Sequence, residues 1–491
     1  MLFKIIPAVV LATLVSLSIQ DIDITVAHDV PVNAHGPIDR AFTSWSLETD
    51  EANSTLGIGN TPNVFNANLI SSLLAVTGGR PWIRVGGTSG DIGARFKPDE
   101  PATYRHYPPS FFKSFNNIKD VDYMFQIPMT PNNITDSVLF FREAYKNIGP
   151  DRLWGVELGN EENVWIVFSG GGADHQTYVN RFLRFEQAII DTGLLQNNTA
   201  FQAIDSQNDR GASDNIAPTI FPMGINANGN IKSVAMHYYQ TSTSQTLQSQ
   251  LMNHTAIKAK MLTYRPAIQY MKQNYPKIPF YLDEVGNGQL GDFSFQQNFG
   301  EALWAVDMQL YAMVQDVSKV SFLLRAESGN SPWTAWPVGG ATPNVKPTYY
   351  AQQFVASFIG GGSAVVKVSL IYESEFYTAY GAYENGKLKR IAVINLQGWN
   401  IGTSPRPSFN FKLHIPVGLT SNLYIQRFQS PNGARGLVSD ITWRGCQWTY
   451  ASLGKVVTEV RNDAFYVLGN ADRVATINLP ASQAYIVNFY D

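Results

Sequence analysis

Cysteine is almost absent from this chain of 491 residues, which contains Cys446 and no other. One cysteine cannot form an intrachain disulfide, so stability has to come from the size of the packed core. Runs of lysine and arginine are also absent, and the formal net charge is -3. A chain without a basic patch has no electrostatic field for nucleic acid or an anionic membrane. We therefore expect neither as a partner, and any anionic ligand must be bound by local groups.

Patterns typical of metal sites and of phosphate-binding loops are missing as well. No pair of histidines with the spacing of metal ligands accompanies the acidic motifs described below, which argues against metal-dependent hydrolysis. No glycine-rich loop follows the first expected strand, where the sequence is SWSLETDE (44–51). That absence disfavours an open, doubly wound sheet. We therefore expect the protein to act without a metal or a cofactor.

Long apolar runs are confined to the N-terminus, where a stretch from Ile5 to Leu17 follows the basic residue Lys4. This run is shorter than the about 20 apolar residues that span a bilayer. It has the length of a signal-peptide core, so residues 1–20 are expected to be a secretory signal. Cleavage could follow Ser18 or occur as late as Ala27. An uncleaved anchor or a buried strand is the alternative.

Glycosylation sequons are consistent with a secreted, extracellular protein. The four acceptor asparagines, each in a polar stretch, are Asn53, Asn133, Asn197 and Asn253. Sequons also arise by chance, so they support export without establishing it.

Eight short apolar or β-branched runs alternate with amphipathic segments between residues 40 and 360. Their ranges are 41–48, 81–87, 122–129, 153–160, 199–207, 233–240, 278–285 and 320–327. Eight such strands over roughly 300 residues are the pattern of an α/β protein with a (β/α)8 TIM barrel. The hydrophobic content of 44% supplies a core large enough for such a domain.

The pattern changes after the glycines at 360–362, which end the last expected helix. Residues 361–491 contain short β-rich runs separated by turn signals, including the hairpin sequence Asn385-Gly386. These features predict a C-terminal all-β sandwich. The segment 21–39 before the barrel is expected to be extended, and it is a candidate for an additional strand of that sandwich.

Two carboxylates stand at the ends of expected barrel strands, Glu161 after the fourth and Glu284 near the end of the seventh. The C-terminal ends of the strands form the active face of a barrel. Glycosidic bond cleavage needs two carboxyl groups at one anomeric centre, and a retaining pair lies about 5 Å apart. We therefore predict that Glu161 and Glu284 are catalytic. Glu157 and Glu162 are expected to have structural roles at a strand end or helix cap.

Four motifs carry a resemblance to a known family. The stretches RVGGTSGD (84–91), ELGNEEN (157–163) and HYYQ (237–240) resemble glycoside hydrolase family 79, which contains β-glucuronidases and heparanase-like endoglucuronidases. This family is part of the large clan of retaining (β/α)8 glycosidases. The stretch ITWRGCQWTY (441–450) resembles the C-terminal β-domain of its fungal-type members. The resemblance covers nearly the whole mature chain.

The resemblance implies a role for each matching residue. Glu161 would be the acid/base and Glu284 the nucleophile. Asn160 would hydrogen-bond the 2-hydroxyl of the sugar. Arg84 would keep the nucleophile ionised, since a nearby cation lowers a carboxylate pKa. A buried salt bridge between Arg84 and Glu157 is the alternative.

The strand containing HYYQ and the residue after the acid/base complete this set. Tyr239 would orient the nucleophile, and His237 would lie in or next to the site, although a lone histidine on a strand is more often a core residue. Glu162 occupies the position where the family commonly has proline. Its charge could raise the pKa of Glu161 by repulsion, or its side chain could point to solvent.

Recognition of a uronate carboxylate has the weakest sequence signal, because no lysine or arginine stands beside Glu284. The backbone amides of Gly286, Asn287 and Gly288 could bind it, or this stretch could be an ordinary strand-to-helix turn. Trp333, together with Trp336, could form a stacking wall for a sugar ring, or could pack in the core.

Taken with the resemblance, these residues indicate a secreted, retaining β-glucuronidase that acts on glycans or conjugates containing glucuronate, including a 4-O-methylated form. Two alternatives stay open: a relative that cleaves neutral sugars, as a β-xylosidase or β-glucosidase does, and a non-catalytic glycan-binding protein. Exo and endo action are both compatible with the sequence, and it gives no signal for an oligomeric state.

Overall fold

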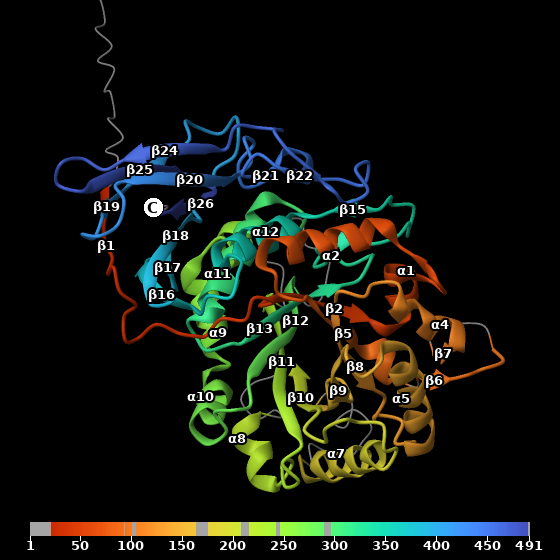
Figure 1. Cartoon of the computed structure of the whole chain (residues 1–491). Coiled ribbons are helices and arrows are strands. Elements are labelled where there is room, and N and C mark those ends of the chain that lie inside the picture. Colours follow the sequence, from red (N-terminus) through yellow and green to blue (C-terminus); the bar gives the residue numbers. More distant parts are fainter. Residues whose placement is uncertain are drawn as a thin grey trace, which may run out of the picture.

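A closed parallel barrel forms the larger part of the molecule (Figure 1). The computed structural model describes residues 21–92, 94–100, 105–163, 175–207, 216–241, 246–288 and 296–489. The barrel strands, in the order in which they pair, are β2 (Thr43–Glu48), β5 (Trp82–Gly86), β8 (Asp122–Ile127), β9 (Leu153–Leu158), β10 (Phe201–Gln207), β11 (Ile231–Thr241), β12 (Phe280–Gly288) and β13 (Lys319–Leu324). β13 pairs with β2 and closes the barrel. The (β/α)8 barrel predicted from the alternating runs is confirmed.

Helices surround the barrel and cover its strands (Figure 1). The longer ones are α2 (Val64–Thr77), α5 (Ile134–Ile148), α7 (His175–Ile190), α9 (His254–Leu262), α10 (Arg265–Asn274), α11 (Phe299–Met313) and α12 (Pro347–Ile359). α12 ends at Gly360, whose φ of 73° is readily adopted only by glycine. Because helices cover its outer side and side chains fill its inner side, every residue of β12 is buried.

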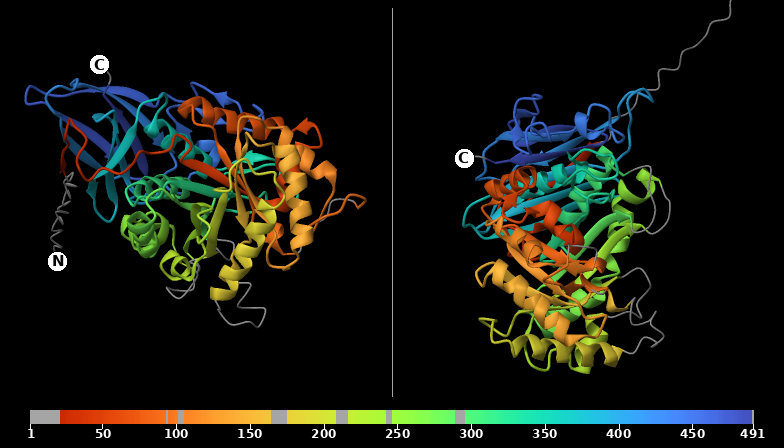
Figure 2. Two further views of the ribbon diagram at one scale, coloured as in Figure 1. Left: turned by 60° about the horizontal axis from the view of Figure 1, so that its bottom comes forward. Right: turned by 90° about the vertical axis from the view of Figure 1, so that its right-hand side faces the viewer.

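The C-terminal domain contains two β-sheets. The larger consists of β16 (Val366–Glu373), β17 (Tyr377–Glu384), β18 (Lys387–Asn395), β26 (Gln483–Asn488), β20 (Asn422–Gln429), β21 (Thr442–Trp443) and β24 (Ala464–Leu468). The smaller consists of β1 (Asp21–Thr25), β19 (Ser408–His414) and β25 (Val474–Pro480). Apolar side chains of the two sheets form one core cluster. The predicted all-β sandwich is therefore confirmed, and Figure 2 shows it in blue beside the barrel.

Both ends of the described chain meet in this sandwich. β1 pairs in parallel with β19, and β26 lies between β18 and β20 in the larger sheet. The turn between β17 and β18 has positive φ angles at Asn385 (47°) and Gly386 (84°). Positive φ at both central residues is the geometry of the tight hairpin turn that Asn-Gly favours.

The barrel and the sandwich share a continuous hydrophobic core. Phe354 of α12 lies with its ring centroid 4.8 Å from that of Trp443 in β21. Phe299, at the start of α11, lies 4.9 Å from Phe428 of β20. Figure 1 shows α11 and α12 directly against the larger sheet. Burial of aromatic rings from both sides stabilises the two domains as one unit.

Two of the expectations from sequence concern the N-terminus and the glycosylation sites. Residues 1–20, the expected signal, lie outside the described residues. In the part of the chain that is described, no helix is long and apolar enough to cross a membrane. The expected glycan acceptors are exposed at Asn133 and Asn197 and partly buried at Asn53 and Asn253.

Candidate active site

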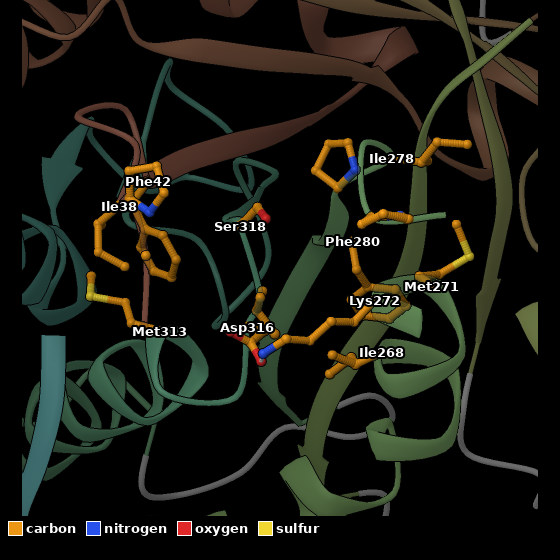
Figure 3. Close-up of a pocket in the computed structure, with 15 residues that line it drawn as sticks. Ile38, Phe42, Ile268, Met271, Lys272, Ile278, Phe280, Met313, Asp316 and Ser318 are labelled. Atoms are coloured by element: carbon orange, nitrogen blue, oxygen red, sulfur yellow. Dashed lines mark hydrogen bonds and ion pairs between the residues drawn. The ribbon is translucent and has the colours of Figure 1, made fainter. Parts of the chain in front are cut away.

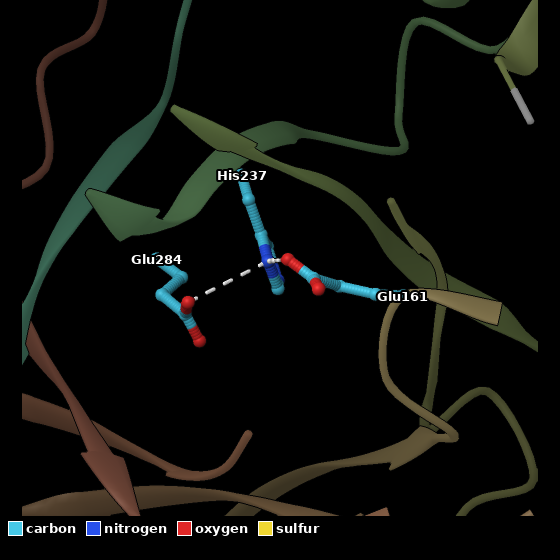
Figure 4. Close-up of side chains that lie close together, drawn as sticks. All are labelled: Glu161, His237 and Glu284. Carbon is cyan, nitrogen blue, oxygen red and sulfur yellow. Dashed lines mark hydrogen bonds and ion pairs between the residues drawn. The ribbon is translucent and has the colours of Figure 1, made fainter. Parts of the chain in front are cut away.

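Glu161, His237 and Glu284 meet at the C-terminal ends of three barrel strands, of which two are adjacent and the third is separated from them by β10 (Figure 4). His237 lies in β11, Glu284 in β12, and Glu161 follows β9. His237 Nδ1 is 2.9 Å from Glu161 Oε1 and 3.8 Å from Glu284 Oε1. One oxygen of each carboxylate and a ring nitrogen of His237 all lie within 4.8 Å of one another. The structure thus brings together two carboxylates from separate strand ends.

Arg84 of β5 connects Glu284, from within the barrel, to the turn that contains Asn160 and Glu161. Its side chain is completely buried and donates from Nη1 to Glu284 Oε2 at 2.8 Å. The same guanidinium donates from Nε to Glu157 Oε2 at 2.8 Å and from Nη2 to Asn160 Oδ1 at 2.6 Å. Arg84 therefore contacts both Glu284 and Glu157, because one planar fork of donors can bind two carboxylates.

Charge and hydrogen bonding favour the ionised form of Glu284. Burial raises the pKa of this carboxyl, but the charges of His237 and Arg84 outweigh burial and hold the pKa below its usual value. The hydroxyl of Tyr239 also donates to Glu284 Oε1 at 2.6 Å, which stabilises the charged form. Burial lowers the pKa of His237, but the charges of Glu284 and Glu161 raise it to about 9. At neutral pH the charged form of His237 is therefore favoured.

A second group of carboxylates fills the interior of the barrel next to this site. Glu157, Asp205 and Asp283 are fully buried, with one oxygen of each within 4.8 Å of the others. The amide of Gln202 donates to Asp205 Oδ1 at 2.6 Å and to Asp283 Oδ2 at 2.5 Å. Burial raises the pKa of Asp205 well above its usual value, and the charges of Glu157 and Asp283 add to this. Burial and these neighbouring charges therefore favour the protonated form of Asp205.

These two clusters are also where oxygen and nitrogen atoms lie near enough to hold a metal ion. Arg84 supplies the positive charge at both clusters, because it binds Glu157 in one and Glu284 in the other. Tyr239 takes the remaining oxygen of Glu284. The donor set therefore fits an arginine-organised carboxylate site better than a metal centre.

The stretch from Gly286 to Gly288 is hydrogen-bonded to the neighbouring loop. The backbone N–H groups of Asn287 and Gly288 both donate to Asn330 Oδ1, at 2.9 Å and 3.1 Å. Asn330 Nδ2 returns a bond to the carbonyl of Gly288 at 2.8 Å. In this structure, two of the three amides proposed from sequence as uronate ligands therefore bind a side chain. Glycine at 286 has a steric reason, since a Cβ there would lie 2.8 Å from Cε1 of Tyr239.

Trp333 lies in the hydrophobic core and not on an exposed surface where a sugar ring could stack. Its side chain is completely buried, and its ring packs edge-on against Trp45 at a centroid distance of 5.3 Å and against Tyr349 at 5.8 Å. Trp336 is partly buried and packs against the same core. Of the two alternatives drawn from the sequence, the structure shows core packing for Trp333.

Glu48 is a buried carboxylate near the site that the sequence interpretation missed. It is the last residue of β2 and accepts hydrogen bonds from the backbone and hydroxyl of Ser89. Burial raises its pKa to about 7, and the charge of Glu284 contributes. The signal that could have found it is the one used for Glu161, namely an acidic residue at the end of an apolar barrel strand.

A separate cavity of about 260 Å³ lies at the opposite end of the strands (Figure 3). Its lining includes Phe280, the first residue of β12, and Ser318, which directly precedes β13. The side chains of Lys272 and Asp316 form an ion pair of 2.6 Å at its edge. The amino ends of barrel strands usually serve stability and not catalysis, so this cavity is not the candidate site.

Comparison with known proteins gives a family and two relatives. Residues 379–486 match the family described as Glycosyl hydrolase family 79 C-terminal beta domain. The chain is 27% identical to a Beta-glucuronidase of Neurospora crassa, with 88% of each chain covered. It is 28% identical to a Beta-glucuronidase of Aspergillus niger, over 95% of this chain and 94% of the relative.

Solved structures share the fold over the whole length. A 4-O-alpha-L-rhamnosyl-beta-D-glucuronidase from Fusarium oxysporum superposes with a TM-score of 0.80 at 18% identity, covering 95% of this chain and 100% of the other. A family 51 alpha-L-arabinofuranosidase from Thermotoga petrophila gives a TM-score of 0.63 at 12% identity, covering 95% and 99%. The barrel, the β-domain and the family match agree with the motifs found in the sequence, and the chain is a glycoside hydrolase whose C-terminal domain, residues 379–486, matches family 79.

Proposed function

We propose that this protein is a retaining β-glucuronidase that removes β-linked glucuronic acid by double displacement. The observation that carries the proposal is the separation of Glu161 and Glu284, whose nearest oxygens lie within 4.8 Å. Retaining pairs have carboxyl groups about 5 Å apart, whereas inverting pairs leave roughly 6.5 to 9.5 Å for a water molecule. The short separation supports direct attack by one carboxylate.

Glu284 is the proposed nucleophile because its surroundings favour the charged form. Arg84 and Tyr239 bind its two oxygens, and the nearby His237 cation lowers its pKa further. In the first step, a carboxylate oxygen of Glu284 forms a bond to the anomeric carbon as the bond to the leaving oxygen breaks. In the second step, water attacks that carbon and releases Glu284.

Glu161 is the proposed acid/base. It gives its proton to the leaving oxygen in the first step and takes a proton from water in the second. His237 Nδ1, 2.9 Å from Glu161 Oε1, fixes the direction of the carboxyl group. Asn160 is held by Arg84 beside the same centre, which suits it to bind the 2-hydroxyl of the sugar.

Preference for a glucuronide rests on the relatives. The two relatives that cover most of the chain are named Beta-glucuronidase, and the solved structure from Fusarium oxysporum is that of a glucuronidase. Asn330 and the stretch 286–288 line the end of β12 next to Glu284, so they are the proposed boundary of the pocket for the uronate end of the sugar. Export to the extracellular space is proposed from the apolar run between Ile5 and Leu17.

A panel of p-nitrophenyl glycosides tests this function, with the Glu284→Gln protein as the control for contaminating activity. We expect release of p-nitrophenol from the β-glucuronide and little from the β-glucoside, β-xyloside and α-L-arabinofuranoside. Preference for a neutral glycoside would replace the glucuronidase assignment. Binding without hydrolysis of any of the four would favour a glycan-binding protein.

A further inference from the structure

Glu162, the residue after the proposed acid/base, is buried and not directed to solvent. Only 1% of its surface is exposed, and Asp91 beside it is completely buried. The two carboxyl groups come from different parts of the barrel, because Asp91 ends the short helix α3 (Thr88–Asp91) after β5. The hydroxyl of Thr130, which follows β8, lies between them.

Hydrogen counting shows that the two carboxyl groups cannot both be ionised. The hydroxyl of Thr130 is within hydrogen-bond distance of Asp91 Oδ2, and it is 3.0 Å from Glu162 Oε1. A hydroxyl has a single proton to donate, and an ionised carboxylate only accepts. Both contacts are hydrogen bonds when the Thr130 hydroxyl donates to one carboxyl group and accepts a hydrogen bond from the protonated form of the other. One of the two carboxyl groups therefore carries a proton.

The surrounding donors identify which group is protonated. Asp91 Oδ1 accepts from the backbone N–H of Met129 at 2.7 Å and of Thr130 at 3.0 Å, so Asp91 has the surroundings of a carboxylate. Glu162 Oε2 is buried and has no hydrogen-bond partner among the described residues. Arg181 Nη1, at 3.7 Å, is within ion-pair range but too far for a hydrogen bond. The proton therefore belongs on Glu162.

Burial raises the pKa of both carboxyl groups, and the rise is stronger for Glu162. Burial raises the pKa of Glu162 well above its usual value, and the negative charge of Asp91 raises it further. Among the described residues, the titratable groups that face Glu162 are Asp91 from α3 and Arg181 and Tyr178 from α7. Arg181 is the one cation among these three groups, and its charge offsets only part of the rise in the pKa of Glu162.

The turn that carries the proposed acid/base needs such support. Glu161 has a φ of 50°, in the left-handed region that side chains other than glycine rarely adopt. The preceding Gly159 has a φ of 79°, and a Cβ there would lie 2.7 Å from Glu162 Oε1. The backbone N–H of Asn160 interacts with the Asp91 carboxylate. Glu162 and Asp91 therefore hold the turn from both sides.

We propose that Glu162 is a protonated positioning residue, and that the hydrogen-bonded chain from Glu162 through Thr130 to Asp91 holds the turn in which Asn160 and Glu161 lie. The role in catalysis rests on the proposed function, because it assumes that Glu161 is the acid/base. The protonation state of Glu162 does not depend on that assumption. Two experiments on the full-length protein separate these parts.

The first experiment measures the melting temperature of the wild type, of Glu162→Gln and of the control Glu143→Gln between about pH 4 and pH 7. A carboxyl with a folded pKa above its usual 4.5 loses stability as pH rises beyond that value, because only the unfolded chain ionises freely. Glutamine keeps a donor for Thr130 and cannot ionise. We therefore expect Tm of Glu162→Gln, relative to wild type, to rise with pH. A difference between Glu162→Gln and wild type that does not change with pH would show that Glu162 is ionised in the folded protein and overturn the proposal.

The second experiment compares Thr130→Val with the conservative Thr130→Ser on two aryl β-glucuronides, one with a poor and one with a good leaving group. Misplacement of the acid/base should lower kcat/KM, which reports the first step, about tenfold for the poor leaving group and much less for the good one. Thr130→Ser keeps the hydroxyl, so its kinetics on both substrates should match those of the wild type. Equal losses on both substrates, or none, would overturn the positioning role. If the wild type cleaves no glucuronide, the proposed function fails, while the melting experiment still decides the protonation of Glu162.

Discussion

The hydroxyl of Tyr239 donates a 2.6 Å hydrogen bond to Oε1 of Glu284. The two residues lie on the adjacent strands β11 and β12, where Tyr239 is the register partner of Gly286. Because position 286 has no side chain, the Tyr239 ring can lie against β12 and reach the carboxylate. The position of a candidate nucleophile therefore depends on a glycine two residues further along the same strand.

Removal of this hydroxyl should shift the pH dependence of the reaction. Tyr239→Phe removes a donor to the charged form of Glu284, so the pKa of the nucleophile should rise. Since the nucleophile must be ionised, the acidic limb of kcat/KM should move to higher pH, with about a tenfold lower kcat/KM at its optimum. Tyr466→Phe, at an exposed position, serves as the control. An acidic limb at the same pH in Tyr239→Phe and wild type would exclude a role for the hydroxyl in ionisation.

Gly286→Ala should resemble Tyr239→Phe without altering any polar group. The new Cβ would lie 2.6 Å from Cγ of Asn330 and 2.8 Å from Cε1 of Tyr239, which is closer than carbon atoms approach. We expect the ring to move and kcat to fall by about tenfold or more, with the fold intact by circular dichroism. Wild-type activity in Gly286→Ala would mean that the close approach of Tyr239 is not required.

Azide should distinguish the roles of the two carboxylates. In Glu284→Ala, azide can enter the space of the nucleophile and give a glucuronosyl azide of inverted configuration. In Glu161→Ala, azide attacks the covalent intermediate on Glu284, so the product azide keeps the β configuration. NMR spectroscopy of the isolated azides measures the difference. The reverse pattern would exchange the two assigned roles.

A buried histidine between the domains should make stability depend on pH. His254 Nδ1 lies 2.7 Å from Asp307 Oδ2 of α11, and Nε2 lies 3.1 Å from Glu373 Oε2 of β16. Burial lowers the pKa of His254, but the Asp307 carboxylate more than offsets this and raises it above 6.5. The stabilisation by the charged histidine is therefore complete below pH 6.5 and is lost as pH rises through the folded pKa.

His254→Gln should consequently lower the melting temperature most at acidic pH. The difference from wild type should shrink as the pH is raised from about 6 to 9, because the wild type loses its own contribution there. His414→Gln, at a half-exposed surface pair with Asp23, provides the comparison. A difference that is the same at both pH values would show that His254 does not change its charge in the folded protein.

The barrel should not fold without the sandwich. Ending the chain at Gly360 would expose the faces of α11 and α12 that bury Phe299 and Phe354 against Phe428 and Trp443. We expect the truncated protein to be insoluble, as judged by sedimentation after expression. A soluble barrel with full activity would show that the shared core is dispensable.

The sequence predicted those parts of the fold that depend on local pattern. Each barrel strand is a short apolar run bounded by polar or turn residues, and the Asn385-Gly386 turn is specified by backbone preference. Glu161 and Glu284 could also be predicted as catalytic candidates, because an acidic residue at the end of a buried strand is unusual. Such features depend on neighbours along the chain.

The remaining features of the site depend on contacts between distant segments. Trp333 follows a barrel strand just as a sugar-stacking residue would, and only its packing against Trp45 and Tyr349 shows that it is in the core. The environment of Glu162 is set by Asp91 and Thr130 from other loops, so no local pattern predicts its burial. The role of Asn330 as acceptor for the amides of β12 is hidden for the same reason.

The configuration of the first sugar product tests the central claim most directly. Hydrolysis of p-nitrophenyl β-glucuronide by the wild-type protein, followed by proton NMR spectroscopy from the first minutes, separates the two anomers before mutarotation mixes them. The short separation of Glu161 and Glu284 predicts that β-glucuronic acid appears first and that the α-anomer grows in later. Initial release of the α-anomer, or no hydrolysis of this glucuronide, would contradict the account of a retaining β-glucuronidase.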